Sequence, residues 1–475
     1  MDVHQQIERV RAALRDGDTL NAVALLSEAR ARAVTATDLL VVEVHSAAFQ
    51  LAVTVGGYGP VPTEDAWAAL RGEVGAALPP LLHRRLALEL RITDGIGALD
   101  AAALDGAVRE ALALLLDDPG ALPTAVRAAS NRLSVRILVL ERVGIGPGEP
   151  GHADALLAIG DARTLADTLG ARGTIDRRAV TAAVAMGDWP RAWEWARHAL
   201  QDDALVPTER AGLLYEAAML ALERGMRADA RALGALVHTS VAGRSSVWAR
   251  LWAASGAVIA AAAGGGSMTA SLRAVARSAE REQHRHEPRY AMRAALVALE
   301  AGAPAAEVLG FLERCLGERA AWPEPWASLI EGTAAQLPWH RLRALDAWCD
   351  GPAAPWQRAA ALRLRAQTRL REGSPTAAAA DISRGLRLTS MWEGHRRVAL
   401  ERLRARLLPE RSITPAQAAV LRLVVEGRTD REIAAELGRS PRTVESHVRA
   451  LLRAYDARNR VALAVAAARE PFLEA

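Results

Sequence analysis

The sequence contains no lysine, so all 59 of its Lys-or-Arg positions are arginines. This absence excludes the chemistry that needs a lysine amine, including the P-loop of nucleotide-binding proteins, a Schiff base and a Ser-Lys dyad. Cysteine is nearly as scarce. Cys315 and Cys349 cannot build a disulfide framework and match no metal-site spacing, which favours a reducing, cytoplasmic environment.

Long apolar runs are also missing, with one arguable exception. The 22 residues between Arg250 and Arg273 carry no charge and are long enough in principle to cross a bilayer. This run is mostly alanine and is interrupted by three consecutive glycines, so it predicts two buried helices joined by a glycine turn. The N-terminal sequence MDVHQQIERVRAALRDGD lacks the basic and then apolar profile of a signal peptide. We therefore expect a protein without a membrane partner.

Alanine and leucine at helical spacing are abundant. Of the 475 residues, 51% are hydrophobic and 24% are charged, which is typical of a globular protein. From residue 1 to about residue 400, apolar residues recur at three- and four-residue spacing, and the alternation typical of strands is nearly absent. The sequence therefore predicts an all-α fold.

Breaks in this helical pattern recur at a regular interval. They fall at residues 187, 225, 265, 302, 338 and 373, so the intervals are 38, 40, 37, 36 and 35 residues. A period of this size with one hinge per unit predicts stacked helical hairpins, an α-solenoid. The segment Met186–Leu200 resembles a tetratricopeptide-type junction, because Gly187 ends one helix and Pro190 begins the next.

The domain organisation follows from these breaks. The Gly- and Pro-rich segment Val143–His152 is the strongest of them, and it indicates either a subdomain boundary or a long loop between repeats. We expect four parts: the N-terminal part of the helical-repeat region over 1–145, tetratricopeptide-like repeats over 150–400, a basic linker over 401–411 and a C-terminal domain over 412–475.

Two clusters in the repeat region leave alternatives open. Five tryptophans lie between residues 322 and 356, and they form either a ligand platform on the concave surface or packing between repeats, which is favoured. His284 and His286 flank Arg285 and could hold a metal ion. Because no carboxylate or cysteine pattern accompanies them, a solvated basic loop is favoured. We expect neither a metal site nor a cofactor.

The C-terminal end of the chain is basic. Residues 384–411 hold eight arginines against three glutamates, and residues 412–469 hold ten arginines against six acidic residues. Such an excess of positive charge suggests a polyanionic partner.

Residues 413–470 contain four short helices, each with its own start signal. Thr414 and Thr429 each begin a capping box, Ser440 and a proline start the third helix, and Asn459 can cap the fourth. The third helix has an apolar stripe made of Val444, Val448, Leu451, Leu452 and Tyr455. Two short helices joined through a glycine, the second with a polar and basic outer face, form a helix-turn-helix.

The third helix has the properties of a DNA-binding helix. Its N-terminus has unpaired backbone N–H groups and positive dipole character, which favour a phosphate oxygen, and Arg442 and Thr443 lie in this turn. One turn further, Glu445, Ser446 and Arg449 point where an inserted helix meets the edges of bases. Arginine can bind guanine through two hydrogen bonds, and a carboxylate can accept a hydrogen bond from N4 of cytosine.

These residues resemble the LuxR-type helix-turn-helix. The matching positions are Thr414-Pro415, Val420-Leu421, Glu426-Gly427, Glu432-Ile433-Ala434, Leu437-Gly438, Ser440, Thr443-Val444, His447 and Arg458-Asn459-Arg460. In that family the third helix enters the major groove, and the fourth commonly forms a homodimer contact. The resemblance implies base contacts from Glu445, Ser446 and Arg449. It implies phosphate contacts from Arg431, Arg442, Thr443 and Arg453. The small and apolar residues that could form a self-complementary dimer seam are Val461, Ala464, Val465 and Ala468.

Helical repeats ahead of a LuxR-type terminus resemble the C-terminal half of the large ATP-binding LuxR regulators, but the ATPase motif G-x-x-x-x-G-K-[ST] is absent here. We expect a non-enzymatic, sequence-specific transcriptional regulator that binds double-stranded DNA as a homodimer. Its repeats would sense an unknown effector or dock a protein in their groove. The alternative is a scaffold whose terminal helices only dimerise. An enzyme is disfavoured, because no carboxylate pair, nucleophile–base arrangement or metal set stands out.

Overall fold

The computed structural model describes residues 2–16, 18–54, 68–69, 72–74, 78–98, 100–143, 150–168, 172–203, 205–242, 247–280, 288–390, 394–407, 413–455 and 457–467. Every regular element within these ranges is a helix. The chain divides into two compact units, Met1–Glu401 and Arg402–Ala475. The expectation of an all-α fold is thus confirmed for the described residues.

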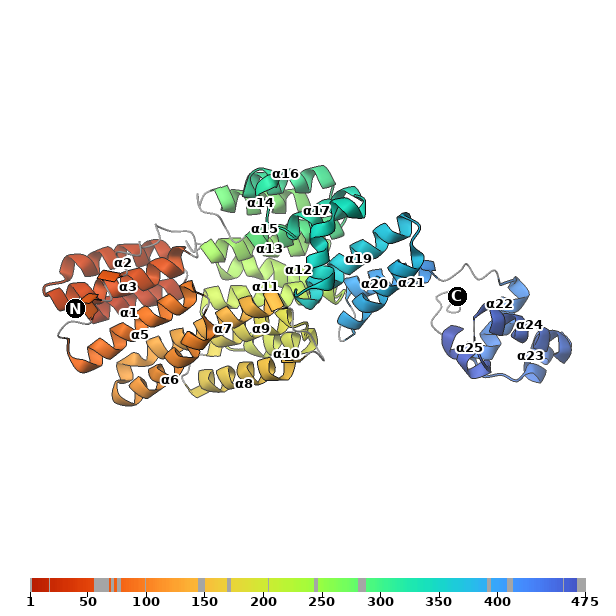
Figure 1. Ribbon diagram of the computed structural model, residues 1–475, viewed down its shortest axis with the longest axis horizontal. Coiled ribbons are helices and arrows are strands. Elements are labelled where there is room, and N and C mark those ends of the chain that lie inside the picture. The colour runs from red at the N-terminus through yellow and green to blue at the C-terminus, as the bar shows by residue number, and fades with distance from the viewer. Residues whose placement is uncertain are drawn as a thin grey trace. The chain divides into compact units, whose positions relative to one another are not determined.

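Helices packed side by side build the first unit (Figure 1). Its N-terminal part contains α1 (Val3–Arg15), α2 (Thr19–Arg32), α3 (Ala36–Thr54), α5 (Pro80–Gly97), α6 (Ala101–Asp117), η1 (Pro119–Ala121), α7 (Leu122–Val143) and α8 (His152–Thr168). The following part contains α9 (Arg172–Ala185), α10 (Trp189–Ala199), α11 (Pro207–Glu223), α12 (Arg227–Ser240), α13 (Val247–Ala262), α14 (Met268–Glu280), α15 (Pro288–Glu300) and α16 (Ala305–Leu316). The last part contains η2 (Arg319–Ala321), α17 (Trp326–Ala335), η3 (Trp339–Arg341), η4 (Arg343–Leu345), α18 (Asp346–Asp350), α19 (Pro355–Arg371), α20 (Pro375–Leu388) and the start of α21 (His395–Leu407). The division between the two units falls within α21, after Glu401.

Five of the six expected breaks are turns between the two helices of a hairpin. They lie at Gly187, Gly225, Gly264–Gly266, Gly302 and Gly373. At Gly225 the φ angle is +77°, a left-handed value that costs any residue with a Cβ atom free energy. At the sixth break, Pro338 precedes η3, η4 and α18 instead of one long second helix. The recurring hairpins confirm the α-solenoid that the sequence period predicts.

The first helices of successive hairpins pack against one another. α9 contacts α11, α11 contacts α13, and α13 contacts α15. Small residues allow close approach: a Cβ atom added at Gly234 of α12 would lie 2.6 Å from the carbonyl oxygen of Gly256 on α13. The uncharged run from Arg250 to Arg273 forms α13, a glycine turn and the start of α14, as predicted. Among the described residues, no helix combines the length and apolar character needed to cross a membrane.

The break at Val143–His152 separates α7 from α8, and residues 144–149 lie outside the described residues. One buried cluster nevertheless joins side chains of α7, α8 and α9, including Leu133, Ile159 and Ile175. The hydrophobic core of the first unit therefore continues from α7 to α9.

A buried carboxylate holds three helices of the N-terminal part together. Glu89 of α5 accepts a hydrogen bond from Arg11 of α1 at 3.2 Å and also pairs with Thr124 and Arg127 of α7. Burial works to raise the pKa of Glu89, but Arg127 and the other cations lower it to about 2. The carboxylate therefore stays ionised and paired.

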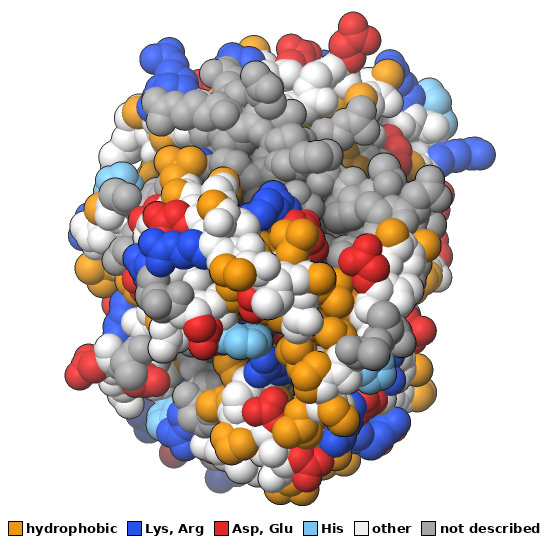
Figure 2. Space-filling view, turned by 90° about the vertical axis from the view of Figure 1, so that its left-hand side faces the viewer, with side chains coloured by type: hydrophobic (Ala, Val, Ile, Leu, Met, Phe, Trp, Pro, Cys, Tyr) orange, Lys and Arg blue, Asp and Glu red, His pale blue; other side chains and the backbone are white. Residues whose placement is uncertain are grey.

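The end of the first unit that carries the N-terminus mixes charges of both signs with hydrophobic side chains (Figure 2). On α2 and the loop after it, Leu20, Val23 and Val34 are 66%, 50% and 92% exposed. Leu20 and Val23, three residues apart on α2, are thus apolar side chains left in solvent.

The tryptophans between residues 322 and 356 serve mainly as packing residues. Trp322, Trp326 and Trp348 are buried, and the ring centroids of Trp326 and Trp348 are 5.3 Å apart in an edge-to-face arrangement. Trp339 and Trp356 are partly buried. This arrangement favours packing over a ligand platform for the three buried rings.

The second unit contains α22 (Pro415–Val425), α23 (Asp430–Glu436), α24 (Pro441–Ala454) and α25 (Arg460–Ala467). α24 packs against α22, α23 and α25. Their shared core includes Leu421, Ile433, Val444, Leu451 and Leu463.

Candidate DNA-binding surface

One face of α24 anchors this helix in the core of the second unit. Val444, Val448, Leu451 and Tyr455 are buried, and Leu452 is partly buried against the same core. The apolar stripe that the sequence predicts is therefore the packing face. Since it occupies one side of the helix, the opposite side is left in solvent.

Side-chain caps fix where the helices of the second unit begin. The hydroxyl of Ser440 accepts a hydrogen bond from the backbone N–H of Thr443 at 3.1 Å, and the two hydroxyls are 2.8 Å apart. Thr414 and Thr429 form the two expected capping boxes, and Asn459 accepts a hydrogen bond from the N–H of Ala462 at 2.8 Å. All four start signals in the sequence are thus confirmed.

The turn between α23 and α24 contains a glycine in the left-handed region. Gly438 has a φ angle of +61°, and Ser440, the N-cap of α24, follows it by two residues. At the start of α23, hydrogen bonds from the backbone and the hydroxyl of Thr429 lower the pKa of Glu432, so this carboxylate stays charged near the positive end of the helix dipole. The two helices and their turn form the expected helix-turn-helix.

The predicted base-contacting residues lie on the exposed face of α24. The side chains of Glu445 and Arg449 are 53% and 70% exposed, and Ser446 is exposed between them. Arg449 donates a hydrogen bond to Glu445 one turn earlier. The structure therefore holds this arginine in a surface ion pair with its neighbour.

The residues predicted to contact phosphates surround that face. Arg442 lies exposed in the first turn of α24, Arg453 lies exposed in its last turn, and Arg431 is exposed on α23. Thr443 is half-buried, and its hydroxyl is engaged with Ser440. The three arginines are therefore open to a polyanion, whereas Thr443 primarily completes the cap.

An ion pair that local sequence patterns did not predict holds α25 against α23. Arg460 donates hydrogen bonds to the carboxylate of Asp430 and to the carbonyl oxygen of Arg428. The two side chains are one-third exposed. Nothing in the local sequence pairs residues 30 positions apart, so only the folded chain reveals that Arg460 positions the first helix of the helix-turn-helix.

The expected dimer seam on α25 is partly in the core. Val461 and Val465 are 72% and 54% exposed, but Ala464 packs partly against the core of the second unit. Ala468 lies outside the described residues. The buried face of α25 consists of Leu463 and Ala467.

The basic segment 384–411 carries less free charge than its sequence suggests. Within the first unit, Arg384 pairs with Asp350 at 2.7 Å, and Arg397 pairs with Glu401 at 3.1 Å. Arg396 is 3% exposed and pairs with two glutamates. α21 also extends through residues 401–407 of the expected linker, and residues 408–412 lie outside the described residues.

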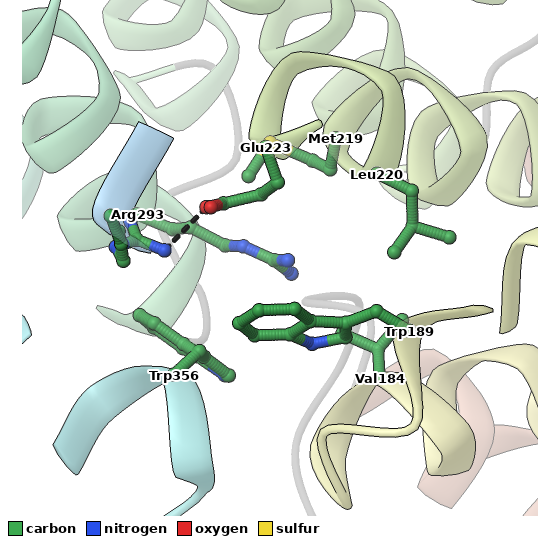
Figure 3. Close-up of a pocket in the computed structure, with 8 residues that line it drawn as sticks. Val184, Trp189, Met219, Leu220, Glu223, Arg293 and Trp356 are labelled. Carbon is green, nitrogen blue, oxygen red and sulfur yellow. Dashed lines mark hydrogen bonds and ion pairs between the residues drawn. The ribbon is translucent and has the colours of Figure 1, made fainter. Parts of the chain in front are cut away.

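The first unit has a small pocket lined by two indole rings. Its lining residues are Val184, Trp189, Met219, Leu220, Glu223, Arg293, Trp356 and Arg396, and Figure 3 shows Glu223 facing Trp189 and Trp356. The volume is about 10 Å³, which is room for roughly one water molecule. Pockets for small organic ligands measure about 300–1,000 Å³. In this conformation the pocket is therefore too small for such a ligand.

No cluster of potential metal ligands occurs in the part of the chain that the structure describes. The only histidine cluster in the sequence, His284 and His286, lies outside that part. The two expectations for that segment, a metal site or a solvated loop, therefore stay predictions.

Comparison with known families agrees with the geometry of the second unit. Residues 411–467 match the family model described as bacterial regulatory proteins, luxR family. The chain matches no curated protein and no solved structure. The match covers all four helices of the second unit and the exposed face of α24. Residues 411–467 are therefore a LuxR-family helix-turn-helix domain, and this domain supports a role for the chain in DNA-binding transcriptional regulation.

Proposed function

We propose that the chain regulates transcription by placing α24 in the major groove of a specific duplex. The observation that carries this proposal is the division of α24 into a buried apolar face and an exposed face. The exposed face consists of Arg442, Glu445, Ser446, Arg449 and Arg453. A helix that is fixed on one side and polar on the other has the geometry that major-groove binding requires.

Glu445, Ser446 and Arg449 specify the target sequence in this proposal. They lie on the middle of α24, beyond the turn that faces a phosphate. The guanidinium of Arg449 donates two hydrogen bonds to a guanine, and the carboxylate of Glu445 accepts one from cytosine N4. Arg449 exchanges its surface ion pair with Glu445 for the guanine contact, and such exposed pairs contribute little free energy.

Arg431, Arg442 and Arg453 supply the affinity that does not depend on sequence. Their exposed guanidinium groups lie on two helices that flank the turn, where they neutralise phosphates on both sides of the groove. The capped N-terminus of α24 adds backbone N–H donors and the positive end of the helix dipole. The backbone N–H of Thr443 donates a hydrogen bond to the hydroxyl of Ser440, which fixes this end of the helix.

Dimerisation through α25 would present two copies of α24 to the DNA. The exposed Val461 and Val465 are one helical turn apart, so they form an apolar strip that a second copy of α25 covers. Two helix-turn-helix domains related by a two-fold axis bind half-sites about one turn of the duplex apart. We propose a homodimer on DNA. Ala464, which is partly buried in the core, lies at the edge of the contact between the two copies of α25.

We also propose that the solenoid senses an effector or docks a partner protein. Its stacked hairpins offer an extended surface, and short connections link each hairpin to the next. A signal received there reaches the DNA-binding domain through α21, the last helix before it.

Selection of bound sequences from a random duplex library tests the proposal. The full-length chain should enrich one sequence with two half-sites, and its affinity for that duplex should fall steeply as salt rises. Salt-dependent binding without any enriched sequence would contradict sequence-specific regulation. Absence of binding would favour the scaffold whose terminal helices only dimerise.

A further inference from the structure

The start of α21 is bound between two helices that are distant in sequence. Arg396 pairs with Glu223 of α11 and with Glu300 of α15, the latter at 3.0 Å. His395 lies 3.2 Å from a carboxylate oxygen of Glu223 and 3.0 Å from one of Glu300. Two carboxylates thus hold two neighbouring side chains of α21.

An aromatic ring completes the binding site for Arg396. The central guanidinium carbon of Arg396 lies 5.4 Å from the ring centroid of Trp356, within cation–π range. Arg293 lies 5.5 Å from the same centroid, so the indole carries two guanidinium groups. Figure 3 shows Trp356 and Trp189 on one side of this space and Glu223 on the other.

The carboxylate of Glu300 stays charged because of its cationic neighbours. Burial works to raise the pKa of Glu300, but Arg396 and then His395 lower it well below its ordinary value. Arg363 of α19 also pairs with Glu300 at 3.2 Å. Removing Arg396 would therefore leave buried negative charge without its main partner, and another cation could take the vacated place.

Arg396 does not satisfy the site completely. Its Nε atom is buried, and among the described residues it has no hydrogen-bond acceptor. An unsatisfied donor of this kind costs free energy, so Arg396 is bound less tightly than its charge interactions alone imply. A ligand with a better fit can compete with it.

Arg396 lies at the start of α21, the helix that leads to the DNA-binding domain. α21 runs from His395 to Leu407, and only residues 408–412 separate it from Ile413 of the second unit. Further along α21, Leu400 is fully buried against Gly385 of α20, where an added Cβ atom would lie 2.8 Å from its side chain. Ion pairs thus hold the beginning of α21, and close side-chain packing holds its middle.

We propose that Glu223, Glu300 and Trp356 form a guanidinium-binding site whose resident occupant is Arg396. A ligand that carries a guanidinium group, free or as an arginine side chain, replaces Arg396 and releases the start of α21. This inference rests on the proposed sensing role of the solenoid and names the chemistry of its effector. The resident side chain identifies that chemistry, because the site already binds a guanidinium through two carboxylates and an aromatic face.

Chemical rescue of Arg396→Ala in the full-length chain tests the site without DNA. The variant should unfold at a lower temperature than the wild type. Low millimolar ethylguanidinium should raise this unfolding temperature part of the way back, and the effect should saturate. Ethylammonium, which has the same charge without the planar fork, should not. Arg404→Ala, at an exposed position of α21, is the matched control and should show neither loss nor rescue. Equal effects of the two ions would overturn the site, and so would a lack of rescue both by ethylguanidinium and by the arginine peptide described next.

A second arm distinguishes the source of the guanidinium. A peptide with the sequence of His395–Leu407 presents an arginine as a partner protein would. Rescue by the peptide alone assigns the site to a protein, and rescue by ethylguanidinium as well assigns it to small ligands too. A peptide with alanine in place of Arg396 should be inactive, and equal activity of this control would overturn the proposal.

Hydrogen exchange covers the case in which Arg396→Ala does not fold. In Arg396→Gln, backbone amides of residues 397–407 should exchange at least about tenfold faster than in Arg404→Gln, while α11 and α15 keep their protection. Unchanged protection of α21 would overturn the release step. Because neither measurement uses DNA, a failure here is distinguishable from a failure of the wild type to bind an operator.

Discussion

Replacement of Arg449 by alanine should remove discrimination at the guanine that it contacts while leaving the fold intact. Its side chain is 70% exposed, and its only partner among the described residues is Glu445 in an i,i+4 pair. Such a pair contributes about 0.3–0.5 kcal/mol. The free energy of unfolding of the variant should therefore lie within about 0.5 kcal/mol of the wild-type value. A bidentate contact to guanine provides roughly 1–3 kcal/mol of discrimination, which corresponds to about 5- to 150-fold in affinity.

The assay compares two duplexes that differ at one guanine in the selected sequence. Fluorescence anisotropy should show that wild-type protein prefers the intact duplex by about 5- to 150-fold, and that Arg449→Ala binds both with nearly equal affinity. Circular dichroism of the variant serves as the folding control. If Arg449→Ala kept the full preference at every guanine of the site, the assignment of this side chain to base contacts would be refuted.

Three further predictions follow from the same structure. Arg442→Ala should weaken binding to all duplexes about equally and should reduce the slope of log affinity against log salt by about 1 per protomer, which a salt titration measures. Val465→Asp should abolish dimerisation on DNA without unfolding the domain, since this side chain is 54% exposed, and analytical ultracentrifugation with a two-half-site duplex checks it. Burial opposes a charge on His395, but Glu223 and then Glu300 raise its pKa above the ordinary value. Its contribution to stability is therefore complete below the ordinary pKa of about 6.5 and is lost as pH rises through the raised pKa. Thermal unfolding from about pH 6 to about pH 9 should show a smaller pH dependence in His395→Asn than in the wild type, and identical dependence would contradict this assignment.

The fold class was predictable because its signals are local. A helical hairpin leaves a glycine with positive φ in the sequence, as at Gly187 and Gly225, and the spacing of such breaks shows that the hairpins repeat. The replacement of a long helix by η3, η4 and α18 after Pro338 has no such signal. Trp326 and Trp348 lie on either side of this stretch, and their ring centroids come within 5.3 Å only when the chain folds.

The candidate DNA-binding surface was largely predictable for a similar reason. The caps at Ser440 and Asn459 and the apolar stripe of α24 are properties of single helices. The Arg460–Asp430 pair and the binding of Arg396 between α11 and α15 join residues that are distant along the chain. Composition counts every arginine as free positive charge, so it overestimates the charge available to DNA in the segment that contains Arg396.

The central claim is that the exposed face of α24 binds a specific duplex through base and phosphate contacts. The most direct measurement is the affinity of the full-length chain for its selected duplex and for a scrambled duplex between about 50 and about 200 mM salt. With three exposed arginines in each protomer of a dimer, six phosphate contacts predict a loss of about 10³-fold over this range, with the preference for the selected duplex retained. Equal affinity for both duplexes at every salt concentration, or affinity that does not depend on salt, would contradict the claim.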